Sequence, residues 1–431
     1  MFSLIQRCRG GLRTHAILVK NSSTIAIGNG VGAILGFVYW SVAAHWLSPE
    51  VIGSASGLLS LMGFSGLLGD AGLGTLLTGE ILRWPGRERG LISAAMIVAL
   101  LLSLVVGAAI LIVSERVFHV LTNQPLVNLY LVLGCGATGL SLVMDQAWLG
   151  MLESKLRMLR QLLFAILKLS FLVIATIWLS DMSAILGSWV AALLISVVTG
   201  ELLMRRSDNS LFHCPDFELL SSLKSKVMNH YRLDMGIMAP SILLPYLVMV
   251  VLSPSANAVF TMLWMVLVVA SIVPATLATV LFPAIQAEPH HYRNRMNLSL
   301  AISVAYSVAF GVFIFFFSTY ILQVFNPIYA VIGDGYLRLL GFGLIGTAIK
   351  AHICAAARLN NRMRDASLSV FLAALFEFGS VVIGAHFAGL EGVAIGWMIA
   401  TLAEAAVLLM VNPVYGPSVG SIELGVGRRE G

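Results

Sequence analysis

The sequence has few charged residues and few cysteines. Only 11% of its 431 residues are Asp, Glu, Lys or Arg, whereas 58% are hydrophobic, and the mean hydropathy is +0.92. A water-soluble core cannot hold so much apolar surface, so the composition argues against a soluble enzyme and indicates a membrane protein. The four cysteines have no CxxC spacing, which argues against a disulfide framework or a zinc site. The net charge of +5 does not indicate nucleic-acid binding, because the basic residues form short clusters beside apolar segments.

About twelve apolar segments are each long enough, at roughly 20 residues, to cross a bilayer as a helix. Their expected bounds are 22–46, 54–82, 91–113, 127–151, 161–179, 184–204, 233–252, 258–285, 297–322, 335–357, 366–388 and 392–411. The sequence therefore predicts an all-α polytopic membrane protein. The segments between the spans are too short for an extramembrane catalytic domain and carry no HExxH or P-loop motif, so we expect no enzymatic activity, no catalytic residues, no metal site and no cofactor.

The basic residues alternate along the chain. Of the 26 Lys and Arg residues, 22 lie in every second gap between apolar segments, and the longest such gap is 205–232. By the positive-inside rule these gaps are cytoplasmic, which predicts an even number of spans and two cytoplasmic termini. Several tryptophans, among them Trp148, Trp178 and Trp189, lie near predicted span ends, as an aromatic belt at the membrane interface would require.

Three short matches at nearly the same offset indicate that the chain repeats itself. They are Leu47-Ser48-Pro49 with Leu252-Ser253-Pro254 at an offset of 205, 134–139 with 341–346 at an offset of 207, and Gly187-Ser188-Trp189 with Gly396-Trp397 at an offset of about 208. Six spans per half is an even number, so the halves are predicted to be parallel repeats, an arrangement typical of transporters that rock one half against the other. The expected organisation is a six-helix bundle over 1–204, a cytoplasmic linker over 205–232, a second six-helix bundle over 233–411 and a cytoplasmic tail over 412–431.

Ionisable side chains inside the spans are the candidates for function, because charge at membrane depth is costly unless it faces protein or water. The candidates for binding substrate in a cavity are Lys168, Arg338, Lys350 and His352. The candidates for coupling transport to an ion are Asp70, Asp145 and Glu377, and Glu404 is a further acid within a span. We expect Lys350 to have no compensating charge at depth. For every one of these residues the alternative is an ion pair or hydrogen bond between helices, which the sequence leaves open.

Two stretches resemble a known family. Trp46-Leu-Ser-Pro-Glu-Val-Ile-Gly53, followed by the glycine-rich segment 68–75, resembles the start of Wzx-type flippases, and Gly389–Trp397 resembles the short loop before their last span. These flippases belong to the MOP superfamily, which also contains the MATE drug exporters. The resemblance implies a V-shaped bacterial inner-membrane carrier with both termini in the cytoplasm. It would move an undecaprenyl-diphosphate-linked oligosaccharide, a repeat unit of O-antigen, capsule or exopolysaccharide, by alternating access.

The resemblance also implies the partners of such a carrier. They would be the lipid-linked substrate and membrane lipids, not nucleic acid, and the carrier would be a monomer with proton or sodium coupling left open. The diphosphate would need cations, which Lys168, Arg338 and Lys350 can supply. The first two spans lack interior arginines, which argues against a lipid II flippase. A MATE-type cation-coupled multidrug exporter stays as the alternative, because it would use buried carboxylates such as Asp70 or Glu377.

Overall fold

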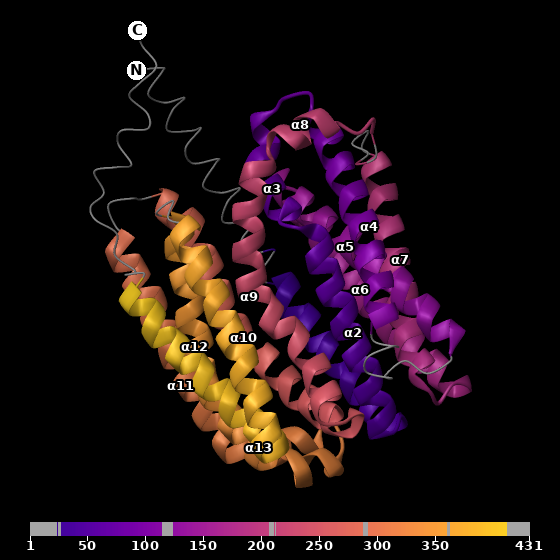
Figure 1. Cartoon of the computed structure of the whole chain (residues 1–431), viewed down its shortest axis with the longest axis vertical. Helices are drawn as coiled ribbons and strands as arrows, with labels where there is room; N and C mark the ends of the chain where they lie inside the picture. The colour runs from indigo at the N-terminus through magenta and orange to yellow at the C-terminus, as the bar shows by residue number, and fades with distance from the viewer. Residues whose placement is uncertain are drawn as a thin grey trace.

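The protein is described by a computed structural model, which places residues 24, 27–113, 124–206, 211, 213–287, 292–359 and 363–411. The expected tail 412–431 lies outside the described residues. The first helix is Ile27–Trp46. It is followed by α2 (Pro49–Asp70), α3 (Leu73–Glu80), the 3-10 helix η1 (Ile81–Arg83), α4 (Glu88–Val113), α5 (Pro125–Gly150), α6 (Ser154–Trp178), α7 (Met182–Arg206), α8 (Phe217–Ser222), α9 (Lys224–Val251), α10 (Pro254–Ala287), α11 (Tyr292–Gln323), α12 (Pro327–Leu359) and α13 (Met363–Val411). The predicted all-α membrane fold is confirmed (Figure 1).

Eleven helices of the described chain are long and apolar enough to cross a membrane. The last of them, α13, is bent back on itself, because the backbone leaves helical geometry at Ala388 and at Gly389, where φ is +57°. The two arms then pack closely. A Cβ added to Gly384 would lie 2.1 Å from the carbonyl oxygen of Gly392, so only glycine allows this approach. The hairpin supplies two crossings, which brings the total to the twelve predicted from the sequence.

The second predicted span is interrupted. Helix α2 begins at Pro49, with the Ser48 hydroxyl accepting a hydrogen bond from the Val51 N–H. It ends at Asp70, where Ala71 and Gly72 take left-handed backbone conformations before α3 starts. A single helix over 54–82 is therefore wrong, since the chain turns at this glycine.

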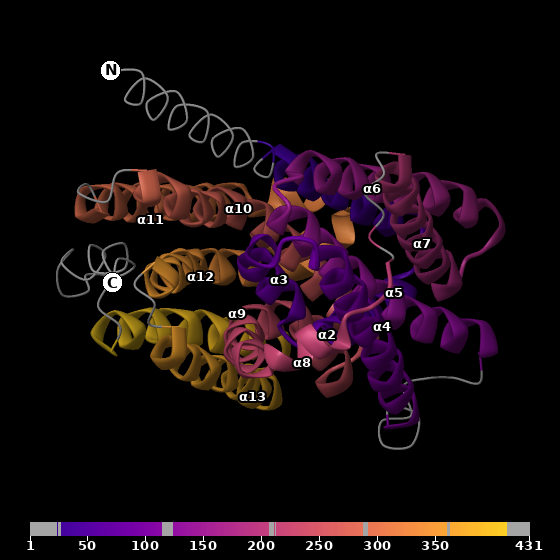
Figure 2. The same ribbon diagram turned by 90° about the horizontal axis from the view of Figure 1, so that it is seen from above.

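The two halves of the chain meet along α2, which packs against both α9 and α10 (Figures 1 and 2). Two of the hydrogen bonds between α2 and α10 join residues that are 205 positions apart, Glu50 with Ser255 and Ser56 with Thr261. That separation equals the offset of the Leu-Ser-Pro repeat. Residues at equivalent positions of two repeats can touch only near the axis that relates them, so these bonds mark the pseudo-two-fold axis of a pair of parallel repeats.

The segment that joins the halves is attached to the N-terminal half. The guanidinium of Arg87 donates two hydrogen bonds to the Asp216 carboxylate, at 2.7 and 2.9 Å, and lowers the pKa of that carboxyl. The Ser93 hydroxyl donates to the Leu211 carbonyl and accepts from the His213 N–H. Both contacts lie at the start of α4, so the linker follows the N-terminal half up to α8.

Candidate functional site

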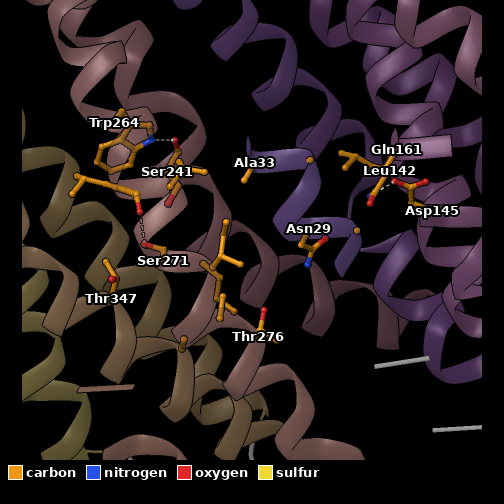
Figure 3. Close-up of a pocket in the computed structure, with 18 of the residues that line it drawn as sticks. Asn29, Ala33, Leu142, Asp145, Gln161, Ser241, Trp264, Ser271, Thr276 and Thr347 are labelled. Carbon is orange, nitrogen blue, oxygen red and sulfur yellow. Dashed lines mark hydrogen bonds between the residues drawn. The ribbon is translucent and has the colours of Figure 1, made fainter. Parts of the chain in front are cut away.

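A cavity of about 710 Å³ lies between the two halves of the protein (Figure 3). Its lining comes from the first helix and from α5, α6, α7, α9, α10, α12 and α13, so both repeats build it. In Figure 3, Asp145 and Gln161 lie on the wall of the N-terminal half, whereas Trp264 and Thr347 lie on the opposite wall. Cavities of roughly 300–1,000 Å³ hold small-molecule ligands in proteins. The volume is therefore in the range of a small-molecule binding site.

The cavity is closed at one end of the helices. In the first helix, the residues near its N-terminus, such as Gly28 and Asn29, line the cavity. The hydrogen bonds from this helix to the other half lie near its C-terminus. There the Ser41 hydroxyl donates to the carbonyl of Val324 at 2.8 Å, and the Asn326 amide donates to the carbonyl of Ala44 at 3.2 Å. The hydrogen bonds between α2 and α10 lie at the same closed end. The first helix and the start of α2 thus bond to the other half at this end, whereas at the opposite end the Thr75 hydroxyl of α3 donates to Asp234 of α9 at 2.7 Å.

Lys168 lies on the N-terminal wall inside a cage of aromatic rings. Its Nζ lies 4.1 Å from the ring centre of Trp189 and 5.1 Å from those of Tyr39 and Phe164, within the range of cation–π attraction. The Tyr39 hydroxyl is itself held by the Ser188 hydroxyl at 3.1 Å. Within the described part of the chain, no carboxylate forms an ion pair with Lys168, although its side chain is buried. The wall therefore presents a positioned cation without a counter-charge.

A second cation of the same helix is neutralised. Arg160 donates two hydrogen bonds to Asp145, at 2.7 and 2.6 Å, and Gln161 donates a third at 3.0 Å. A further guanidinium N–H reaches the Ser196 hydroxyl at 3.3 Å. The bidentate pair joins α5 to α6, and Ser196 adds α7. Asp145, a coupling candidate, is therefore paired with an arginine that lies just before the predicted span 161–179.

The wall of the C-terminal half carries Lys350 and Glu377, and Glu404 pairs with the same lysine from outside the lining. Lys350 Nζ lies 2.9 Å from Glu404 and 3.5 Å from Glu377, and the indole N–H of Trp397 donates to Glu377 at 2.8 Å. The expectation that Lys350 is uncompensated is therefore wrong, because two acids from the α13 hairpin surround it. Two carboxylates and one ammonium leave a formal charge of −1 in this cluster.

The remaining sequence candidates lie elsewhere. Arg338 pairs with Asp334 at 2.7 Å and does not line the cavity. His352 is fully buried and also lies outside the lining, with its ring nitrogens within hydrogen-bonding distance of the Ser299 hydroxyl and the Ala348 carbonyl. Asp70 accepts hydrogen bonds from two backbone N–H groups of the turn that follows it. Arg338 and His352 thus lie outside the cavity lining, and all three residues have local structural partners.

The aromatic rings around Lys168 were not predicted to belong to the site. Trp189 lines the cavity and Trp148 is fully buried, so the aromatic-belt prediction is wrong for these two, although Trp178 is 82% exposed. The internal repeat held a signal that could have found the site. Lys168 and Glu377 are separated by 209 residues, and their tryptophan neighbours Trp189 and Trp397 by 208. Equivalent positions of the two repeats therefore face one cavity.

Comparison with solved structures identifies the fold. An inward-facing multidrug resistance MATE family transporter of the MOP superfamily superposes with a TM-score of 0.70 at 17% identity, covering 92% of this chain and 96% of that one. An outward-facing structure of such a transporter gives a TM-score of 0.63 at 18% identity, covering 92% and 94%. A MATE in complex with MaD3S gives a TM-score of 0.64 at 17% identity, covering 92% of this chain and 94% of that one. The chain therefore has the fold of these transporters.

The family follows from the sequence. Residues 18–288, more than half of the chain, match the model of the family described as polysaccharide biosynthesis protein, so the chain belongs to this family. No curated protein matches the chain in a sequence comparison.

Proposed function

We propose that this transporter moves a polyprenyl-diphosphate-linked oligosaccharide across the bacterial inner membrane by alternating access. The observation that carries the proposal is Lys168, a buried cation that faces a 710 Å³ cavity with no acidic partner among the described residues. A charge at membrane depth is costly, and one that is left without a counter-ion indicates a function for it. An anionic ligand such as a diphosphate would supply the missing charge.

A cation-coupled drug exporter is the second candidate, because the fold is shared with MATE transporters and carboxylates lie in the C-terminal wall. A lone lysine would repel the cationic drugs that such an exporter would carry. The membership in a polysaccharide biosynthesis family also favours the sugar-lipid substrate.

The two candidates can be separated in proteoliposomes. The purified protein is expected to move a fluorescent polyprenyl-diphosphate disaccharide between leaflets faster than protein-free liposomes do, and a lipophilic cationic dye no faster. The measurement is the fraction of each probe that an external quencher reaches over time. Transport of the dye without movement of the lipid-linked sugar would replace the flippase by the exporter.

We further propose that the closed end of the cavity faces outward, since the flanking basic clusters lie at the other end. In a variant that lacks the four native cysteines, Ser180→Cys is expected to react with a membrane-impermeant maleimide added to intact cells. Ser221→Cys, on α8, is expected to react only after permeabilisation. Both positions are exposed, so the comparison reports orientation and not burial. The reverse labelling pattern would invert the orientation.

A further inference from the structure

The two sides of the cavity differ in formal charge. On the N-terminal wall, Arg160 and Asp145 cancel and Lys168 leaves one positive charge. On the C-terminal side, Lys350 and Glu377 line the cavity, and Glu404 pairs with Lys350 from outside the lining, so this cluster has a formal charge of −1. An elongated ligand with an anionic end would therefore bind in one orientation, because reversal would set its anion against the carboxylates.

The negative charge is held in place. Glu377 accepts from Trp397, whose ring packs edge-on against Trp264 with 5.1 Å between centres. One carboxylate oxygen of Glu404 is buried without a hydrogen-bond partner in the described structure, so Lys350 does not satisfy the whole cluster. Glu404 itself does not line the cavity, but its charge lies next to the lining residue Lys350 and disfavours a second anion nearby.

The same wall is rich in hydroxyl groups. Ser241, Ser271 and Thr347 lie together on this side in Figure 3, and Thr401 adds a fourth hydroxyl to the lining. The hydroxyls of Ser271, Thr347 and Thr401 each donate to a carbonyl of their own helix, so their oxygens remain as acceptors for the hydroxyl groups of a sugar. On the N-terminal wall, by contrast, the aromatic cage surrounds the free cation. The N-terminal wall thus offers a cation among aromatic rings, and the C-terminal wall offers hydroxyl groups.

We infer that the C-terminal wall is a subsite for the first sugar of the substrate and that it selects against a sugar bearing a carboxylate. This inference rests on the proposed function, in which the diphosphate lies at Lys168. The first sugar is attached directly to the diphosphate, and in a cavity of 710 Å³ it lies against Glu377 and the hydroxyl groups. A neutral or amino sugar donates to the carboxylate, whereas a uronic acid is repelled by it.

A matched pair of ligands tests this selectivity. Short-chain polyprenyl-diphosphate glucose and polyprenyl-diphosphate glucuronic acid differ only in the carboxylate. Binding of each to the full-length protein in nanodiscs is measured by competition against a labelled glucose ligand. The wild-type protein is expected to bind the glucose form about tenfold more tightly, which corresponds to about 1.4 kcal/mol. Glu404→Gln is expected to bring the two affinities together, since it removes the excess charge and keeps the side-chain shape.

Each outcome addresses one proposal. Lys168→Met should weaken both ligands by the same factor, because the diphosphate is common to them. Equal wild-type affinities that both depend on Lys168 would overturn the sugar selectivity and leave the flippase proposal standing. Tighter binding of the glucuronic acid form would also overturn it. No saturable binding of either ligand would overturn the proposed function, and this inference with it. The wild-type ratio alone decides the question if the Glu404→Gln variant does not fold.

Discussion

Lys168→Met is expected to reduce transport of the lipid-linked oligosaccharide at least about tenfold, because a hydrogen bond to a charged group is worth about 1.5–3 kcal/mol. Methionine keeps the length of the side chain and its packing against Trp189 but cannot hold an anion. The folded protein should be no less stable, since the substitution removes a buried charge that has no acidic partner among the described residues. The transport rate in proteoliposomes and the thermal midpoint in detergent measure the two effects separately.

Lys155→Met is the matched control for this result. Lys155 is exposed at the start of the same helix, α6, and lies outside the cavity lining. Its replacement should leave transport unchanged. Lys168→Arg should retain a large part of the activity, because it keeps the charge and a guanidinium also stacks on aromatic rings. Full transport by Lys168→Met would remove this lysine from the site.

Lys350→Met is expected to act on stability more than on binding. The substitution leaves Glu377 and Glu404 buried together without a cation, and breaking a buried ion pair from one side costs about 3–5 kcal/mol. The amount of folded protein in the membrane and the thermal midpoint should both fall. This result differs from the one expected for an uncompensated lysine, which could be replaced without loss of folded protein.

A second substitution tests whether the stranded carboxylates cause the loss of stability in Lys350→Met. Adding Glu404→Gln to Lys350→Met removes the nearer of the two stranded carboxylates, so the double variant should recover a large part of the lost stability. Adding Asp334→Asn, which changes a carboxylate that pairs with Arg338 away from the cavity, should give no recovery. If Lys350→Met is as stable as the wild type, the charge balance of this cluster does not hold the helices together.

The membrane fold could be predicted because its signals are local in the sequence. Each span needs a run of apolar residues, and the start of α2 at Ser48-Pro49 and the turn at Gly389 are set by the residues at those positions. The interruption at Gly72 was missed, although the sequence is glycine-rich there. Hydropathy does not separate a continuous span from two helices whose apolar segments adjoin.

The site could be predicted only in part. Lys168 and Lys350 were named as cavity candidates and both line the cavity, but so does Arg160, which had been assigned to a loop. The charge of Arg160 is cancelled by Asp145, 15 residues away on another helix. Nothing in the local sequence distinguishes this arginine from one that flanks a span.

The sequence by itself determined that this is a helical membrane protein with about twelve apolar spans and an internal repeat, because apolar length and an offset near 205 are properties of the chain alone. Only the tertiary structure decided which buried charges are paired. Lys350 contacts acids 27 and 54 residues away, whereas the partners of Lys168 among the described residues are aromatic rings. Those partners depend on how each helix is rotated against its neighbours. Lipid and protein interior are both apolar, so hydropathy carries little information about that rotation.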